Sequence, residues 1–329
     1  MTDCGDSSHN MTTKAVQEKQ PKISVVVVVY NMRREAERTL YSLSPRFQRD
    51  VCEDDYEVIV IDNGSTEPLS NEFVAGFGGN FRYFFVRSGS RSPAAAANHG
   101  IGETRGNCIG LMIDGARMVS PGIIKYALHG MKLGHGPVVA TLSWHLGPDV
   151  QYRSMAKGYN RELEDRILAG IDWEKNGYRL FDISSFAGAS TGGFFLPIAE
   201  SNCLFLTKRV LEQLGGFDER FQAPGGGFVN FDLYKRACEL PGSNLIIMLG
   251  EGTFHQVHGG VSTNVTAEQN RIRLHEFEKE YFEIRKAPFS LPANLPEFIG
   301  HIPREALRFM EHSVQRASQT LCRKTRRDK

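Results

Sequence analysis

The feature that most constrains the fold is the uninterrupted apolar run ISVVVVVY at residues 23–30. A β-branched run without alternating polar residues is typical of a central parallel strand that is covered on both faces. Residues 31–43 follow with apolar side chains at helical spacing, and residues 56–61 form a second strand-like run that ends in the turn sequence DNGS at residues 62–65. The chain therefore begins as strand, helix and strand, which is the opening of an α/β fold.

The alternation of strand-like and helix-like segments continues along the chain. Further strands are predicted at residues 81–86, 109–113, 138–142, 201–207 and 245–249, and further helices at residues 93–100, 208–214 and 231–240. Residues 145–200, rich in glycine, proline and aromatic residues, are interpreted as an irregular segment over the edge of the sheet. The prediction is an α/β fold with a mainly parallel central sheet flanked by helices.

Charge and cysteine content exclude several classes of protein. The chain has 39 Lys and Arg against 38 Asp and Glu, and a nucleic-acid-binding protein would usually be more basic. None of the six cysteines lies in a CxxC pair, which favours reduced thiols and a cytoplasmic location. No apolar run approaches the ~20 residues of a membrane-spanning helix. Residues 1–20 also lack the apolar stretch of a secretory signal.

Small polar residues follow three of the predicted strands. Tyr30 and Asn31 come at the end of the first strand, Asp62 after the second and Asp114 after the fourth. In sheets of this type, ligands bind at the carboxyl ends of the strands. We therefore expect these side chains to share one edge of the sheet and to form a binding site there.

Four stretches of the chain together resemble one family. VVVVYNMRREAERTLYSL at residues 26–43 is similar to its strand–turn–helix opening, and VIVIDNGST at residues 58–66 to its strand ending in an Asp turn. LMIDGARMVSPG at residues 111–122 is similar to the segment that carries its Asp-x-Asp motif. LGGFDERF and GGGFVNFDLYKR, within residues 214–236, are similar to its acceptor motif. In this order, they resemble family 2 glycosyltransferases of the GT-A fold over roughly residues 22–265.

The resemblance implies a nucleotide-sugar donor and the residues that bind it. Asp62 is expected to meet the base or ribose, with Tyr30 and Asn31 lining the same slot. Asp114 matches the Asp that meets ribose or a divalent metal ion, and Asn98 matches an Asn near the donor. The sugar nucleotide carries a diphosphate leaving group, whose developing charge must be neutralised by a metal or by basic groups. Arg91, just before the helix that carries Asn98, is a candidate for contact with the phosphates.

The resemblance also implies the reaction: transfer of a hexosyl unit from a UDP- or GDP-sugar to a hydroxyl of a glycan or lipid-linked glycan acceptor. Cell-envelope or capsular polysaccharide synthesis is the expected setting. No specific sugar, base or acceptor follows from the sequence, and neither the oligomeric state nor the choice between inversion and retention is fixed by it.

The chain departs from the family pattern at two motifs. Ala116 stands where the second Asp of Asp-x-Asp is usual, so a Mn²⁺ or Mg²⁺ ion would lose one ligand. A late His is a metal ligand in many GT-A enzymes, and His255 and His258 lie in the matching region. We therefore expect Asp114, His255 and His258 to form the metal site. Imidazole completes an oxygen-rich site, although Mn²⁺ prefers carboxylates.

The second departure lies in the acceptor motif. Asn230 replaces the carboxylate that acts as the base in inverting members, and an amide cannot accept a proton in that way. Asp232 is retained at a position where the family usually has a support residue. These two residues are the predicted catalytic candidates. The alternative is a glycosyltransferase-like binding protein without catalysis. A nucleotidyltransferase or a dehydrogenase is disfavoured, because no glycine-rich loop follows the first strand.

The chain is predicted to have three parts. Residues 1–21 are expected to be a disordered leader. Residues 22–265 are expected to form the transferase domain, with a nucleotide-sugar half at 22–143 and an acceptor half at 144–265. Residues 266–329 are expected to be a helical C-terminal extension that ends in a basic tail. The tail is interpreted as a solvated helix end; the alternative is attraction of its basic residues to anionic lipid, with peripheral contact to a membrane.

Overall fold

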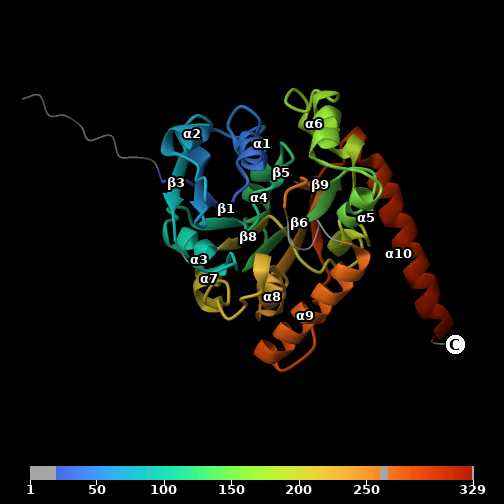
Figure 1. Cartoon of the computed structure of the whole chain (residues 1–329). Coiled ribbons are helices and arrows are strands. Elements are labelled where there is room, and N and C mark those ends of the chain that lie inside the picture. Colours follow the sequence, from blue (N-terminus) through green and yellow to red (C-terminus); the bar gives the residue numbers. More distant parts are fainter. Residues whose placement is uncertain (1–19, 88, 260–265, 328–329) are drawn as a thin grey trace, which may run out of the picture.

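The structure is a computed structural model that describes residues 20–87, 89–259 and 266–327 (Figure 1). Apart from its last two residues, the predicted leader lies outside this part of the chain. So does part of the basic tail: residues 328–329, and the side chains from residue 324 onward. In the described part, no helix is both long and apolar enough to cross a membrane.

A mixed sheet runs through the middle of the molecule (Figure 1). Over the described residues it has ten strands, in the order β10-β9-β6-β8-β4-β1-β2-β3, with β5 paired to β9 and β7 paired to β6. The strands are β1 (Ile23–Val29), β2 (Tyr56–Asp62), β3 (Phe81–Phe85), β4 (Cys108–Met112), β5 (Arg117–Val119), β6 (Pro137–Leu146), β7 (Ser184–Phe186), β8 (Leu204–Thr207), β9 (Asn244–His255) and β10 (Glu297–Gly300).

Helices cover both faces of this sheet. They are α1 (Arg33–Leu43), α2 (Asn71–Ala75), α3 (Ala94–Gly102), α4 (Ile123–Gly130), α5 (Gln151–Ala156), α6 (Arg161–Ala169), α7 (Lys208–Leu214), α8 (Val229–Glu239), α9 (Ala267–Arg285) and α10 (Leu307–Arg327). One apolar cluster joins α1, α2 and α4 to the sheet, and a second joins α3, α7 and α8 to it. The predicted α/β fold is confirmed.

The central position of β1 follows from its composition. All seven of its residues are buried, and it pairs in parallel with β2 on one side and β4 on the other. In the register, Val29 lies opposite Asp62, and Val27 lies opposite Met112, two residues before Asp114. The polar residues that follow β1, β2 and β4 therefore share the carboxyl edge of the sheet, as predicted.

The second half of the chain is more regular than the sequence indicates. Residues 145–200 contain α5, α6 and β7 as well as irregular backbone. The predicted strand at residues 245–249 is too short, because β9 continues to His255. Gly250 (φ 71°) is a turn signal in the sequence, but the strand passes through it while the pairing with β6 shifts register. This continuation carries His255 to the site edge.

The C-terminal extension contains the expected helices α9 and α10, and also a strand. β10 pairs in parallel with the first half of β9, with Glu297 opposite Ile246, and so forms the edge of the sheet. α10 lies on the right of Figure 1 and extends beyond the rest of the fold. Phe309 near its start is 6% exposed, so this end of the helix packs into the core.

A buried carboxylate lies where β9 passes α4. Glu251 has no exposed surface and accepts hydrogen bonds from Ser120 Oγ (2.5 Å), Tyr178 Oη (2.6 Å) and the N–H of Gly122 (3.0 Å). Burial raises the pKa of Glu251 from 4.5 to about 7, although the three donors oppose that shift. The folded state therefore holds this proton over a range in which the unfolded chain has already released it.

This shift predicts a loss of stability on the alkaline side. Because the folded pKa of Glu251 is the higher one, its contribution is complete below pH 4.5 and is lost as the pH rises through 7. We expect the difference in unfolding free energy between wild type and Glu251→Gln to change by roughly 2 kcal/mol between pH 5 and pH 8. Urea denaturation at each pH measures it. A difference that does not vary with pH would contradict the prediction.

Candidate active site

The loop that follows β1 is tied to the loop that follows β2. The Asn31 N–H donates to Ser65 Oγ (2.8 Å), and Asn31 Oδ1 accepts from the Thr66 N–H (2.8 Å). Asn31 has a left-handed backbone conformation (φ 49°), which asparagine adopts more readily than most residues. The side chain of Tyr30 is half exposed. The two residues predicted to line the donor slot thus lie against the turn that follows Asp62.

The Asp62 carboxylate accepts hydrogen bonds from the turn that follows it. The Asp62 side chain has no exposed surface. Oδ1 accepts from the Ser65 N–H (2.8 Å), while Oδ2 accepts from the Leu69 N–H (3.1 Å) and Tyr83 Oη (3.3 Å). These bonds fix the shape of the loop that borders the predicted slot. A direct contact between the Asp62 carboxylate and a nucleoside stays a prediction.

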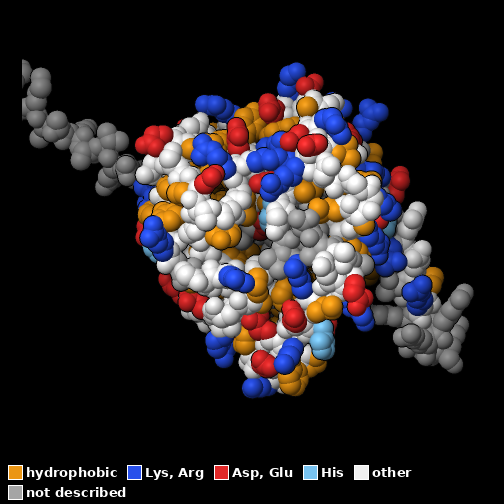
Figure 2. Space-filling model, viewed as in Figure 1, with side chains coloured by type: hydrophobic (Ala, Val, Ile, Leu, Met, Phe, Trp, Pro, Cys, Tyr) orange, Lys and Arg blue, Asp and Glu red, His pale blue; other side chains and the backbone are white. Residues whose placement is uncertain are grey.

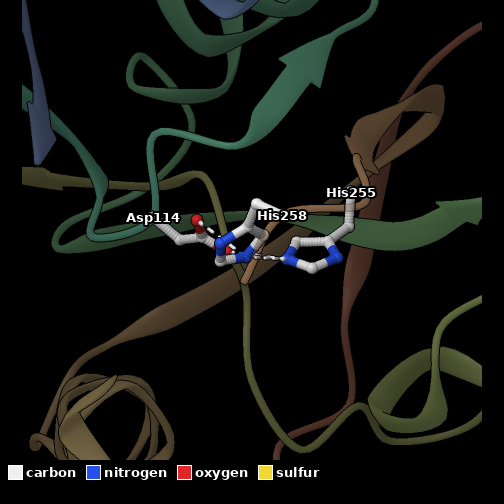
Figure 3. A group of neighbouring side chains, drawn as sticks. All are labelled: Asp114, His255 and His258. Atoms are coloured by element: carbon white, nitrogen blue, oxygen red, sulfur yellow. Dashed lines mark hydrogen bonds and ion pairs between the residues drawn. The ribbon is translucent and has the colours of Figure 1, made fainter. Parts of the chain in front are cut away.

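A carboxylate and two imidazoles meet at the ends of β4 and β9 (Figure 3). Asp114 Oδ2 lies 3.0 Å from His255 Nε2, and Asp114 Oδ1 lies 3.8 Å from His258 Nε2. The two Nε2 atoms are 3.0 Å apart. All three potential ligand atoms lie within 4.8 Å of one another. The structure thus brings together the three residues that the sequence suggested as a metal site.

Three strands fix the position of His255. It lies opposite His145 of β6 and Arg117 of β5. Burial, followed by the charge of Arg117, lowers the pKa of His255 to about 4, so its ring is neutral near pH 7, as metal binding requires. His255 Nδ1 lies 2.7 Å from Gln151 Oε1. If Nδ1 donates its proton to that oxygen, the lone pair of Nε2 is left on the side of Asp114.

The loop that carries His258 is held by α1 and α6. The Val257 N–H donates to Glu164 Oε2 (2.9 Å), and the Val257 carbonyl accepts from Arg34 Nη1 (3.3 Å). Arg34 also pairs with Asp165 (2.5 Å). The loop of His258 is therefore held in place by residues far from it in the sequence.

Figure 2 shows Lys and Arg side chains gathered over α1 and α6, next to a hollow near the centre of this face.

Asp114 is surrounded by groups that favour its charged form. Burial would raise the pKa of its carboxyl, but His255, His258 and Arg117 together hold that pKa well below its usual range. Arg117 Nε lies 3.2 Å from Asp114 Oδ2. The carboxylate is therefore ionised, which is the form that binds a cation.

The residues after Asp114 explain its fixed position. The Ala116 N–H donates to Asp114 Oδ1 (3.1 Å), and the Ala116 carbonyl accepts from the Gln256 N–H (2.9 Å). A Cβ on Gly115 would lie 2.5 Å from Val29 Cγ1, so the backbone approaches β1 as closely as only glycine allows. The methyl group of Ala116 is fully buried. His258, from a different part of the chain, lies beside Asp114 where the second Asp of the family motif is missing.

The donor set fits a divalent metal ion. One carboxylate and two neutral imidazoles, with a polar group behind His255, are ligands of the kind that transition metals use in proteins. The short separation of two imidazole nitrogens, 3.0 Å, also shows that both converge on the same small region. Asp114, His255 and His258 therefore form a candidate metal site at this edge of the sheet.

Asn98 and Arg91 connect the donor half to the loop after α7. Asn98 Oδ1 accepts from the Phe217 N–H (2.9 Å), and Asn98 Nδ2 donates to Glu219 Oε1 (2.8 Å). The side chain of Arg91 is exposed, and its carbonyl accepts from the Gly225 N–H (3.1 Å). Contact of these two side chains with the donor stays a prediction.

The two predicted catalytic residues have different surroundings. Asp232 has no exposed surface; Arg285 Nε binds its Oδ1 (2.5 Å), and Arg236 Nε binds its Oδ2 (2.7 Å). Asn230 is also buried, and its Nδ2 donates to Glu200 Oε2 (2.7 Å). Asp232 therefore takes part in structural ion pairs with two arginines, and the Asn230 amide holds the Glu200 carboxylate. Their catalytic roles stay predictions.

A cavity of about 510 Å³ lies on the side of α8 and α9. It is lined by Asn98, Leu214, Gly215, Gly216, Phe217, Asp218, Glu219, Arg220, Arg236 and Arg285. Most of these residues belong to the stretch that resembles the acceptor motif. A polar cavity of this size is suited to a hydroxyl-rich or charged group.

Three residues of the site were missed by the sequence analysis: Gln151, Arg117 and Glu200. Gln151 and Glu200 lie within the segment interpreted as irregular, where no periodic pattern indicates which side chains turn inward. Arg117 had a signal, because it follows Asp114 by three residues, but β5 was not predicted.

A comparison with known proteins supports the class of enzyme and gives a match to one family model. The mainly parallel sheet flanked by helices is the GT-A fold, and the chain is a glycosyltransferase that uses a nucleotide-sugar donor. Residues 24–115 match the model of glycosyl transferase family 2. This range covers β1, β2, β4 and Asp114.

Two solved structures are similar to this chain at low sequence identity. TarS residues 1–349 of S. aureus, in complex with UDP-GlcNAc, is 14% identical, with a TM-score of 0.48 over 80% of this chain and 73% of that one. The mannosyltransferase PcManGT of Pyrobaculum calidifontis, in complex with GDP-Man and Mn²⁺, is 16% identical, with a TM-score of 0.49 over 90% and 70%. No curated protein sequence gives a significant match.

Proposed function

We propose that this protein moves a hexosyl unit from a UDP- or GDP-sugar to a hydroxyl of a glycan or lipid-linked glycan, with a divalent metal ion at Asp114, His255 and His258. The observation that carries the proposal is the convergence of these three side chains at the carboxyl edge of the sheet, inside and beside the family match. With two imidazoles in the ligand set, Mn²⁺ suits the site better than Mg²⁺.

The donor half supplies a slot and a charged wall. The Asn31–Ser65 and Asn31–Thr66 hydrogen bonds hold two strand-end loops side by side, and Tyr30 offers a ring for the nucleoside. A metal ion bound at the cluster would neutralise the charge that develops on the diphosphate as it departs. Arg117, beside Asp114, adds a positive charge that is present without metal.

A polar cavity on the side of α8 and α9 borders the stretch that resembles the acceptor motif. Its wall carries charges of both signs, because Arg220, Arg236 and Arg285 pair with Asp218 and Asp232, and Glu219 also lines it. We propose a cell-envelope or capsular glycan as the acceptor class. A cytoplasmic location, with peripheral membrane contact through α10 and its basic tail, belongs to the same proposal.

The proposal predicts that nucleotide and metal stabilise the protein together. In a thermal-shift screen of UDP, GDP, CDP and their sugars, the matching nucleotide at ~100-fold its Kd should add about 2.7 kcal/mol with Mn²⁺ present. His255→Ala and His258→Ala should lose most of the Mn²⁺-dependent part. His129→Ala, on α4 and away from the cluster, is the matched control.

The same samples should be assayed for release of nucleoside diphosphate from the sugar nucleotides. Release that requires the matching donor and Mn²⁺ supports the proposed transfer. Tight binding of a nucleotide sugar without any release would instead identify a binding protein. No stabilisation by any nucleotide would overturn the proposal.

A further inference from the structure

We propose that Glu200 is the general base that takes the proton of the acceptor hydroxyl, and that Asn230 positions it. The proposal rests on the function proposed above and adds the group that the acceptor motif of this chain lacks. It also predicts the stereochemical outcome, because a base beside the acceptor serves a single displacement that inverts the anomeric centre.

The first observation is the contact itself. Asn230 Nδ2 donates to Glu200 Oε2 (2.7 Å) and also to the Ser201 carbonyl (3.1 Å). Asn230 is 5% exposed in the first turn of α8, while Glu200 is half-buried. Over the part of the chain that the structure describes, Glu200 Oε1 has no hydrogen-bond or ion-pair partner. One oxygen of the carboxylate is thus held and the other remains for a ligand.

The second observation places this contact at the site edge. β8 runs antiparallel to β4, with Leu204 opposite Leu111. Because the two strands are antiparallel, the segment that precedes β8 lies at the carboxyl edge of β4, which Asp114 follows. Glu200, four residues before β8, therefore belongs to the same edge of the sheet as the metal cluster.

A chain of side-chain contacts supports this placement. Asn202 Nδ2 donates to Ser143 Oγ (2.9 Å), and Thr253 Oγ1 donates to the same Ser143 Oγ (3.1 Å). Thr253 precedes His255 by two residues on β9. The segment that carries Glu200 is therefore tied to the strand that carries a metal-site histidine.

The other candidate carboxylates of the site are already occupied. Both oxygens of Asp232 are bound by Arg285 and Arg236, and its side chain has no exposed surface, so an acceptor hydroxyl cannot reach it. Asp114 belongs to the metal cluster. Of the two carboxylates in the cavity wall, Asp218 pairs with Arg220 and Arg285, and Glu219 is exposed and accepts from Asn98. Glu200 is the carboxylate that the acceptor-motif residue Asn230 holds.

The step is a displacement that conserves atoms and electrons. The acceptor oxygen forms a bond to the anomeric carbon of the donor as its proton moves to the Glu200 carboxylate. The bond between that carbon and the diphosphate oxygen breaks, and the nucleoside diphosphate leaves with the electron pair. The protonated Glu200 then returns its proton to water.

The test separates a base from a structural residue. Glu200→Gln keeps an oxygen that can accept the Asn230 hydrogen bond but cannot take up a proton. We expect kcat for nucleoside diphosphate release to fall about 10²- to 10⁴-fold, with the donor KM and the melting temperature unchanged. Glu212→Gln, an exposed carboxylate on α7, should have no effect. A structural role predicts full activity for Glu200→Gln.

The probes are UDP-glucose, UDP-GlcNAc, UDP-galactose and GDP-mannose with Mn²⁺, using water or simple glycosides as acceptors. If wild type releases no nucleotide from any of them, the proposed function fails, and this inference with it. If wild type is active and Glu200→Gln equally so, only the inference fails.

A rescue and a product analysis complete the test. Asn230→Asp restores a carboxylate at the position where the family has one, so Glu200→Gln/Asn230→Asp should be faster than Glu200→Gln alone. NMR of the product should show inversion at the anomeric carbon. Retention of configuration would overturn the assignment of Glu200 as a base.

Discussion

Asp114→Asn is expected to lower kcat for nucleoside diphosphate release by about 10³-fold. Losses of this size are typical when an enzyme loses a group that stabilises the charge of the transition state. Asp114 is held ionised beside two histidines and an arginine, and it is the one carboxylate of the metal cluster. The amide cannot carry the negative charge that attracts the cation. Steady-state release assays over a range of Mn²⁺ concentrations measure both the rate and the metal requirement.

The control is Asp54→Asn. Asp54 is exposed and precedes β2, at the opposite edge of the sheet from Asp114, so its loss should leave the rate unchanged. Circular dichroism should show both variants folded. A rate for Asp114→Asn within a few-fold of wild type, with the same Mn²⁺ dependence, would count against the metal site.

Arg285→Met is expected to lower the free energy of unfolding by about 3 kcal/mol, the lower end for breaking a buried ion pair. Arg285 binds Oδ1 of the fully buried Asp232 (2.5 Å) and Oδ2 of Asp218 (2.9 Å). Methionine keeps much of the packing of the long side chain but leaves Asp232 with Arg236 alone. Urea denaturation measures the change.

A matched control lies on the same helix. Among the residues that the structure describes, Arg271 pairs with Glu268 alone, and both side chains are mostly exposed. Arg271→Met should therefore change stability by no more than about 0.5 kcal/mol. Adding Asp232→Asn to Arg285→Met should recover part of the loss, because it removes a buried charge that keeps only Arg236 as a partner. Equal effects of Arg285→Met and Arg271→Met would show that the Asp232 ion pairs contribute little.

Much of the first half of the fold could be predicted from sequence because its signals are local. The valine run of β1 by itself indicates a buried strand, and the Asp at the end of β2 by itself indicates a turn. The carboxyl-edge rule then places Asp62 and Asp114 together without any knowledge of side-chain contacts. The register of β1 with its two neighbours confirms that placement.

The rest depends on contacts between distant segments. The glycines at 250 and 252 indicate a turn, yet β9 continues through them because β5 and β6 pair with it on both sides. β10 was not predicted, because its edge position leaves three of its four residues exposed and gives no apolar run. In both cases, strand partners decide the structure rather than local propensity.

The roles of individual site residues were harder to predict for the same reason. Asp62 and Asp232 have the expected identity and position, but their carboxylates are bound by neighbours that the sequence does not indicate. Glu200 has no motif of its own, and its relation to Asn230 depends on how the start of α8 packs against the segment before β8. Sequence patterns locate such a site more readily than they assign its chemistry.

The central claim is that Asp114, His255 and His258 hold the metal at which a nucleotide sugar binds. Its most direct test is anomalous diffraction from crystals grown with Mn²⁺ and the nucleotide selected by thermal shift. The account predicts a manganese peak within bonding distance of these three side chains, with the diphosphate beside it and the nucleoside against the loops of Tyr30 and Asp62. A nucleotide bound elsewhere, or manganese absent from the cluster while nucleotide is bound, would contradict it.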